Sequence, residues 1–334
     1  MRNREGSGKA LQKAMAEVKD PAVLREMGSA VDRLSPYSTP SATREVLERH
    51  GLYTKYGLGQ NFLVNDDIIR KIIQLADVVS DDCVLEVGPG IGTLTAALLQ
   101  HAGYVVAIEK DADLPAVLAD TLEPWRSSFA LLSKDALDIR EQDLSGFATP
   151  TKMVSNLPYA VAATVVLDYF QRFGFLKSAT VMVQKEVADR MMAKPGTKAY
   201  GAYTVKLGMY AQPAGRFPVA PGNFFPPPHV ESAVLRLERI ELVDEAGTPV
   251  PDEVRAAACT MADAAFANRR KTLANSCRTH FSGIGDRGAK VTELLPGIFA
   301  EAGIDPKRRG ETLSQQEFIN LGRALAALPG DDAR

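Results

Sequence analysis

The sequence predicts a doubly wound α/β fold followed by a smaller, all-helical domain. Between about residues 45 and 185, short apolar runs alternate with stretches of helical period, as expected for parallel strands joined by crossover helices. Beyond about residue 245 the helical period continues without a convincing strand. A chain of 334 residues is long enough for two such domains.

The expected strands are short and rich in Val, Ile and Leu on both faces, which is typical of a buried parallel sheet. They cover residues 83–87, 104–108, 129–133, 152–155 and 179–183, and helices are expected between them, including 93–101 and 162–173. Two further strand candidates, 204–210 and 233–237, flank residues 218–229, where prolines predict a loop. The helices expected in the second domain cover residues 251–267, 269–276, 290–302 and 314–325.

The first 40 residues are polar and end in a Ser/Pro-rich stretch. The spacing of Leu11, Met15, Val18 and Leu24 gives a weak amphipathic pattern, but the composition favours a loosely ordered extension. We therefore expect three parts: an N-terminal extension at residues 1–40, an α/β domain at 41–242 and a helical domain at 243–334.

The composition limits the classes of partner and cofactor. The formal net charge is −2, so a nucleic-acid surface would have to be a local patch. The three cysteines and four histidines show no ligand spacing, and no metal is expected. No apolar run approaches the ~20 residues of a membrane span, and the N-terminus lacks the apolar segment of a secretory signal. We therefore expect a cytoplasmic protein without a membrane partner.

A glycine-rich turn, Gly88-Pro89-Gly90-Ile91-Gly92, follows the first expected strand and precedes a helix. Glycines there let a ligand approach the backbone closely. A dinucleotide fingerprint would require glycine at position 93, where this chain has Thr93, which argues against a nicotinamide oxidoreductase. Glu109 follows the second strand and Asp135 the third, at the sheet edge where carboxylates can bind ribose and an adenine amine. This order favours a nucleoside-containing cofactor over a tight turn with incidental acidic neighbours.

The tetrad Asn156-Leu157-Pro158-Tyr159 follows the fourth expected strand. The side-chain oxygen of Asn156 and the backbone oxygen of Leu157 can each accept a hydrogen bond from a planar amine, and Pro158 stiffens the second acceptor. Tyr159 offers a ring on which a base can stack, an interaction worth about 1–3 kcal/mol. Alone, the tetrad is equally consistent with a simple turn. Beside the cofactor residues, it predicts methylation of an exocyclic amine by positioning and electrostatics, without a strong general base.

Further motifs extend the pattern over roughly residues 55–321. They are Gly59-Gln60-Asn61-Phe62-Leu63, Val84-Leu85-Glu86-Val87-Gly88-Pro89-Gly90, Gln184-Lys185-Glu186-Val187-Ala188, Phe224-Phe225-Pro226-Pro227-Pro228-His229-Val230-Glu231-Ser232, Phe266 with Arg269-Arg270-Lys271-Thr272-Leu273, and Arg309-Gly310-Glu311-Thr312-Leu313-Ser314. With the tetrad, they make the chain resemble the rRNA adenine dimethyltransferases of small-subunit assembly. The resemblance implies a Rossmann-like S-adenosylmethionine-dependent methyltransferase domain and a helical domain that docks on RNA. It also implies methylation of two adjacent adenines near the 3′ end of 16S rRNA, in the small ribosomal subunit or its precursor.

The resemblance also assigns roles to residues. The cofactor-binding residues that it implies are Gln60, Asn61, Leu63, Gly88, Gly90, Glu109, Asp135 and Asn156. The catalytic residues that it implies are Asn156, Leu157, Pro158, Tyr159 and Phe224, with Phe224 closing the far face of the target base. The basic clusters Arg269-Arg270-Lys271 and Lys307-Arg308-Arg309 are expected to contact phosphates, although solvated helix ends would explain them too. One departure is Ala160, where many relatives carry Asn.

Two other functions fit part of the pattern. A large-subunit rRNA adenine methyltransferase of the macrolide-resistance type would share the fold, but the helical domain with Arg269-Arg270-Lys271 argues against it. A non-catalytic RNA-binding assembly factor would not need the intact Asn156 and Tyr159. We therefore expect an active enzyme, and a monomer.

Overall fold

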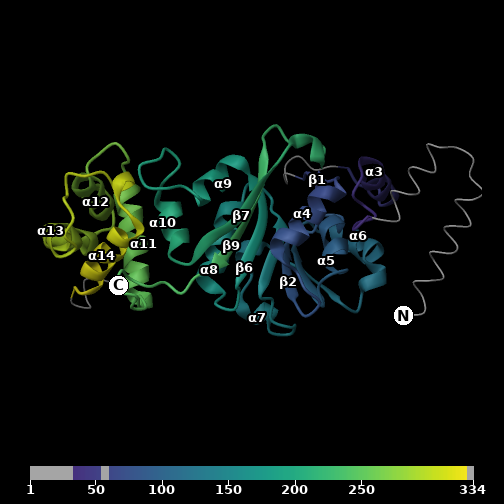
Figure 1. The fold of residues 1–334 in the computed structure, drawn as a ribbon, viewed down its shortest axis with the longest axis horizontal. Helices are drawn as coiled ribbons and strands as arrows, with labels where there is room; N and C mark the ends of the chain where they lie inside the picture. The colour runs from purple at the N-terminus through teal and green to yellow at the C-terminus, as the bar shows by residue number, and fades with distance from the viewer. Residues whose placement is uncertain (1–32, 54–59, 329–334) are drawn as a thin grey trace, which may run out of the picture.

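The computed structural model describes residues 33–53 and 60–328. At its centre is a seven-stranded sheet with the order β4-β3-β2-β5-β6-β9-β7 (Figure 1). The strands are β2 (Cys83–Val87), β3 (Tyr104–Glu109), β4 (Phe129–Ser133), β5 (Lys152–Asn156), β6 (Ser178–Gln184), β7 (Ala211–Val219) and β9 (Ser232–Arg239). The strands from β2 to β6 are parallel, whereas β9 is antiparallel to both of its neighbours. The carboxyl ends of the parallel strands therefore share one edge of the sheet with the first residue of β9.

Helices cover both faces of the sheet, because its strands are apolar on both sides. On one face, α4 (Asp66–Ala76), α5 (Thr93–Leu98) and α6 (Leu114–Thr121) pack in a core that contains Val84 and Val105. On the other face, α8 (Ala162–Arg172) and α9 (Lys185–Met191) pack in a core that contains Leu85 and Val106. Neighbouring strand residues thus alternate between two cores, and the doubly wound α/β prediction is confirmed.

Shorter elements complete the α/β part. A small antiparallel sheet pairs β1 (Phe62–Leu63) with β8 (Phe224–Phe225). The remaining elements are α3 (Pro40–Arg49), α7 (Glu141–Leu144), α10 (Ala202–Gly208) and the 3-10 helices η2 (Glu123–Trp125), η3 (Ala136–Asp138) and η4 (Pro221–Asn223).

The C-terminal part is helical, as expected, and lies at one end of the molecule (Figure 1). Its elements are α11 (Asp252–Phe266), α12 (Leu273–Ser282), α13 (Asp286–Glu301), η5 (Gly310–Thr312) and α14 (Gln315–Ala326). They enclose a separate core that includes Met261, Leu273 and Phe318. No helix in the described ranges combines the length and apolar character that crossing a membrane requires.

The strand expected at residues 204–210 is wrong, because this segment forms most of helix α10. The alternation of Val205, Leu207 and Met209 imitates a strand, but α10 lies between two cores. Leu207 packs in the core under the sheet, whereas Val205 and Met209 pack in the core of the helical domain. A helix buried on two sides lacks the polar face that reveals helical period.

Strand β7 was not predicted. It contains Pro213 and Pro218, and it overlaps the start of the loop expected at residues 218–229. Prolines exclude a segment from the middle of a sheet because they cannot donate a ladder hydrogen bond. β7 tolerates them because it lies at the edge of the sheet, with β9 as its one neighbour. The expected loop also contains two short elements, η4 and β8.

Most of the expected N-terminal extension, residues 1–32, lies outside the described residues. The stretch that precedes α3, however, is held against the α/β domain rather than loosely ordered. The carboxylate of Asp66 on α4 accepts hydrogen bonds from the backbone N–H groups of Leu34 and Ser35, each at 3.1 Å. The Tyr37 hydroxyl donates to the Thr121 carbonyl at 2.7 Å. The polar composition of this stretch did not indicate that a distant carboxylate would accept hydrogen bonds from its backbone N–H groups.

Candidate active site

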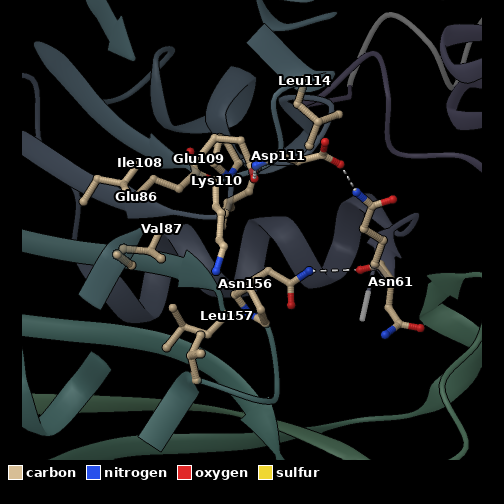
Figure 2. Close-up of a pocket in the computed structure, with 18 of the residues that line it drawn as sticks. Asn61, Glu86, Val87, Ile108, Glu109, Lys110, Asp111, Leu114, Asn156 and Leu157 are labelled. Carbon is tan, nitrogen blue, oxygen red and sulfur yellow. Dashed lines mark hydrogen bonds between the residues drawn. The ribbon is translucent and has the colours of Figure 1, made fainter. Parts of the chain in front are cut away.

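A cavity of ≈ 320 Å³ opens at the carboxyl ends of the parallel strands (Figure 2). Its lining comes from residues 60–63, 86–90, 93–94, 108–111, 134–136 and 156–161, together with Leu114. All eight residues expected to bind a cofactor line this cavity, and so does the tetrad that begins at Asn156. The sheet therefore brings together five regions that are separated in the sequence.

The glycine turn forms a tightly packed wall of the cavity. Gly88 and Gly90 have φ values of 71° and 59°, a conformation that glycine adopts far more readily than other residues. A Cβ atom on Gly88 would lie 3.3 Å from Pro158 Cδ, and one on Gly90 would lie 3.1 Å from the Phe62 ring. Both positions therefore need glycine for the backbone geometry and for close packing.

Glu109 ends β3 within a chain of hydrogen bonds. Its Oε1 accepts from the backbone N–H of Asp111 at 2.8 Å, and the Asp111 carboxylate accepts from Gln60 Nε2 at 2.9 Å. Burial raises the pKa of Glu109, while the backbone N–H groups that it binds act in the opposite direction. This chain connects the residue expected to bind a ribose with the segment that precedes β1.

Glu86 is a further candidate site residue, to which the sequence motif that contains it assigned no role. It lies in the middle of the apolar run of β2, is 1% exposed and lines the cavity. Its Oε2 has no hydrogen-bond partner among the described residues. Burial raises the pKa of Glu86 to about 8, and the negative charge of Glu109 adds to the shift. A side-chain hydrogen bond with Thr95 acts in the opposite direction on the pKa. A buried carboxyl group with one oxygen left without a partner, beside a cavity, is a group that a cationic ligand would satisfy.

Asp135 follows β4 and is already engaged on both carboxylate oxygens. Oδ2 lies 2.5 Å from Lys110 Nζ, and Oδ1 accepts from the Leu137 backbone N–H at 3.0 Å. The Lys110 ammonium lowers the pKa of Asp135, so this residue is a carboxylate at neutral pH. A ligand amine at this end of the cavity would share Asp135 with Lys110.

Asn156, the last residue of β5, is fixed by a contact across the cavity. Its Nδ2 donates to the Asn61 backbone carbonyl at 3.2 Å (Figure 2). Because the amide nitrogen is used in this way, Oδ1 remains as the acceptor at the cavity. The neighbouring Leu157 is 1% exposed, and its N–H donates to the Met182 carbonyl at 3.1 Å. The start of the tetrad is therefore anchored by both its side chain and its backbone.

The other two expected catalytic aromatics lie in different environments. Tyr159 lines the cavity, and its hydroxyl lies 2.7 Å from Ser232 Oγ. Phe224 does not line the cavity: it is 3% exposed and packs in the core beneath α4. Phe224 lies opposite Leu63 in the β1–β8 pair, and both residues pack in this core, although only Leu63 also lines the cavity. The half-buried neighbour Phe225 instead carries the Arg44 guanidinium 5.2 Å from its ring centroid.

The two basic clusters divide into residues that hold the helical domain together and residues that face solvent. Arg269 pairs with Glu311 at 2.7 Å and also donates to the Thr197 carbonyl. Arg308 forms an ion pair with Glu317. These two arginines therefore form contacts within the protein, and their presence does not require a phosphate partner.

The remaining cationic residues gather on neighbouring segments. The backbone N–H of Leu273 donates to the Arg308 carbonyl at 2.6 Å, and that of Gly196 donates to the Glu311 carbonyl at 2.7 Å. These bonds bring the segments around 196, 271 and 308 side by side. We define the basic surface as the exposed cationic residues of these segments: Lys194, Lys198, Arg270, Lys271, Lys307 and Arg309.

No group of three or more His, Cys, Asp or Glu side chains is placed to hold a metal ion within the part of the chain that the structure describes.

Comparison with known proteins gives a consistent result across nearly the whole chain. Residues 52–320 match a family model described as ribosomal RNA adenine dimethylase. Ribosomal RNA small subunit methyltransferase A of Geobacillus kaustophilus is 39% identical over 298 residues, covering 88% of this chain and 98% of that protein. The protein of the same name in Enterococcus faecalis is 40% identical over 292 residues, covering 86% and 96%.

Two solved structures share the fold. A dimethyladenosine transferase from Plasmodium falciparum superposes with a TM-score of 0.62 at 22% identity, covering 78% of this chain and 95% of that one. The 23S rRNA methyltransferase ErmE gives a TM-score of 0.57 at 21% identity, covering 79% and 99%. At these identities the two structures support the architecture only.

Proposed function

The chain belongs to the ribosomal RNA adenine dimethylase family, and we propose that it transfers methyl groups from S-adenosylmethionine to the exocyclic amines of two adjacent adenines near the 3′ end of 16S rRNA. The observation that carries this proposal is the orientation of Asn156. Its amide nitrogen is held by Asn61, so that its oxygen is presented at the cavity as an acceptor. An adenine amine carries two N–H donors, and the tetrad offers two acceptors.

The cavity suits S-adenosylmethionine on three counts. Its volume of ≈ 320 Å³ lies within the range of about 300–1,000 Å³ that small-molecule pockets occupy. The turn at Gly88 and Gly90 presents bare backbone to the cavity. Glu86 offers a buried carboxyl oxygen without a partner among the described residues, and the methionyl part of this cofactor carries an ammonium group.

We assign the holding residues accordingly. Glu109 binds the ribose hydroxyls, Asp135 binds the adenine amine, and Glu86 faces the ammonium group. Gln60, Asn61 and Leu63 form the wall that closes over the Gly88–Gly90 backbone. When bound, the cofactor supplies an electrophilic methyl group on a sulfonium.

The tetrad prepares the acceptor amine. The lone pair of an adenine amine is delocalised into the ring, so the amine is a poor nucleophile until it is positioned and rehybridised. Asn156 Oδ1 and the Leu157 carbonyl accept hydrogen bonds from its two N–H groups, which directs the lone pair towards the methyl group. Pro158 fixes the Leu157 carbonyl, and the Tyr159 ring stacks on the base. Phe224 is not assigned a role in this step, because it is buried and does not line the cavity.

The basic surface supplies the attraction for RNA that the slightly acidic chain lacks as a whole. Its residues belong to both domains, with Lys194 and Lys198 in the α/β part and the other four in the helical part. Phosphate contacts from such a surface fix register and orientation without reading sequence. A monomeric state and a cytoplasmic location remain predictions from the sequence.

Mass spectrometry of rRNA tests the proposed function. Purified protein is incubated with S-adenosylmethionine and with separate small and large ribosomal subunits that lack the modification. We expect methyl groups on two adjacent adenines of 16S rRNA alone. Methylation of 23S rRNA would instead assign the chain to the large-subunit enzymes, and RNA binding without methylation would indicate an assembly factor.

A further inference from the structure

Ser232, the first residue of β9, lies at the same edge of the sheet as the candidate active site. β9 is antiparallel to β6, and Ser232 pairs with Gln184, the last residue of β6. The adjacent strand β5 ends at Asn156. The register therefore places Ser232 at the acceptor end of the cleft, although it follows the tetrad by more than seventy positions.

The backbone around Ser232 is held on two sides. It pairs with Gln184 of β6 on one side and with Val219 of β7 on the other, and the residue is 0% exposed. A buried hydroxyl requires a hydrogen-bond partner, because leaving it without one costs about 1–3 kcal/mol. The Tyr159 hydroxyl supplies that partner at 2.7 Å.

The contact acts on the far end of the Tyr159 ring. The backbone of Tyr159 lies between Pro158 and the exposed Ala160, and its ring lines the cavity. Hydrogen bonding at the hydroxyl, opposite the Cβ atom, fixes the direction of the ring in addition to its attachment point. Burial raises the pKa of Tyr159, so the phenol stays protonated and can donate to Ser232.

We propose that Ser232 is a positioning residue for the methyl transfer, which holds the Tyr159 ring in the orientation that stacks on the target base. This inference rests on the proposed function for its consequence, but the contact itself can be tested without it. It gives a role to the end of the proline-rich motif, whose first residue, Phe224, is buried away from the cavity. The motif thus acts on the acceptor through Ser232.

A double-mutant cycle tests the catalytic consequence with Ser232→Ala, Tyr159→Phe and the combined variant. We expect each single change to lower kcat about tenfold with little change in KM for small subunits, since positioning is lost but binding is not. The combined variant should be no slower than either single variant. Ser178→Ala, at the opposite end of β6 and also buried, is the control and should keep the wild-type rate. Independent, multiplicative losses, or a wild-type rate for Ser232→Ala, would overturn the proposal.

Fluorine NMR tests the contact independently of activity. Protein labelled with 3-fluorotyrosine contains nine tyrosines, and the Tyr159 resonance is the one that Tyr159→Phe removes. Ser232→Ala should shift this resonance and narrow it as the ring rotates more freely, whereas Ser178→Ala should not. An unchanged resonance would refute the positioning role even if the protein methylates a different RNA. A shifted resonance in a protein inactive on 16S rRNA would retain the contact and reject only the proposed function.

Discussion

The cofactor side and the acceptor side of the cavity are built in different ways. On the cofactor side, most groups come from the glycine turn and from acids within β2, at the end of β3 and after β4, each placed mainly by its own strand. On the acceptor side, Asn156 is held by Asn61 and Tyr159 by Ser232, so each functional side chain depends on a distant segment.

This difference separates what local structure can specify from what requires the complete fold. A strand followed by a glycine turn places the central part of the cofactor side within a few residues, and the segment 60–63 completes it. The acceptor side forms only when β1 and β9 have reached the sheet edge. Substitutions on the cofactor side should therefore change binding and ionisation, and those on the acceptor side should change turnover.

The largest effect is expected on the acceptor side, for Asn156→Ala. Loss of the Oδ1 acceptor removes one of two hydrogen bonds that orient the amine, so the methylation rate should fall about 10²–10³-fold. Binding of small subunits should stay near the wild-type value, because the lost interaction is made in the transition state. Single-turnover kinetics and filter binding measure the two quantities. A variant that loses RNA affinity and rate equally would contradict the division between the two sides.

On the cofactor side, Glu86→Gln should remove a pH dependence of stability. Burial raises the folded-state pKa of Glu86 from an ordinary 4.5 to about 8. Between these values the unfolded chain is ionised while the folded chain keeps its proton, so wild-type stability falls as pH rises through this window. Glutamine cannot ionise, and the variant should lack that fall.

The expected difference in the free energy of unfolding between Glu86→Gln and the wild type grows to about 3 kcal/mol from pH 5 to pH 8. Urea denaturation at intervals of pH measures it. Glu123→Gln, on an exposed residue of η2, is the matched control and should follow the wild type. Parallel curves for Glu86→Gln and the wild type would show that Glu86 is ionised in the folded protein.

The sequence predicted most residues that line the proposed cofactor side of the cavity. Gly88, Glu109 and Asp135 each follow an apolar run that forms a strand where expected, and all three line the cavity. The role of Glu86 was missed, although an acid within an apolar strand is itself a signal. Its consequence depends on burial and on the absence of a partner, which only packing reveals.

The acceptor side was predicted by residue type but not by arrangement. The tetrad lies at the cavity, whereas Phe224, on the strand that pairs with β1, packs in a hydrophobic core. The same long-range packing hid the helix at α10 and the proline-containing edge strand β7. Each error concerns a residue or segment whose environment is set by an element distant in the chain.

Glu109→Ala should weaken cofactor binding by about 1–3 kcal/mol, the range for loss of a hydrogen bond to a charged group. The change also removes the hydrogen bond that the backbone N–H of Asp111 donates to Glu109 Oε1 at 2.8 Å. Isothermal calorimetry with S-adenosylmethionine measures the affinity, and Glu123→Ala serves as the control. Equal affinities of Glu109→Ala and the wild type would remove Glu109 from the ribose site.

RNA docking should depend on the solvent-facing half of the first basic cluster. Changing Arg270 and Lys271 together to Glu should weaken binding of small subunits roughly tenfold and flatten its salt dependence, since each lost phosphate contact reduces the log–log slope by about 0.7–0.9. Arg269→Ala should instead lower the melting temperature, because it breaks the ion pair with Glu311. A changed salt slope for Arg269→Ala, or none for the double variant, would reverse these assignments.

The smallest effect concerns the stretch before α3, which supports the cofactor side from outside. Val46 and Leu47 of α3 share a core cluster with Phe62, which packs on the glycine turn. Asp66 ties the preceding residues to α4 through the backbone N–H groups of Leu34 and Ser35. Asp66→Asn should therefore cost about 1 kcal/mol of stability, as a charge-assisted acceptor becomes a neutral one. Asp67→Asn removes the same charge from the same helical turn without these contacts. Arg70→Ala breaks the Asp66–Arg70 ion pair at 3.3 Å and keeps the carboxylate, so thermal unfolding of the three variants isolates the anchor. Equal melting temperatures would mean that the Asp66 contacts do not anchor this stretch, and a larger loss of cofactor affinity for Asp66→Asn would extend the cofactor side to α3.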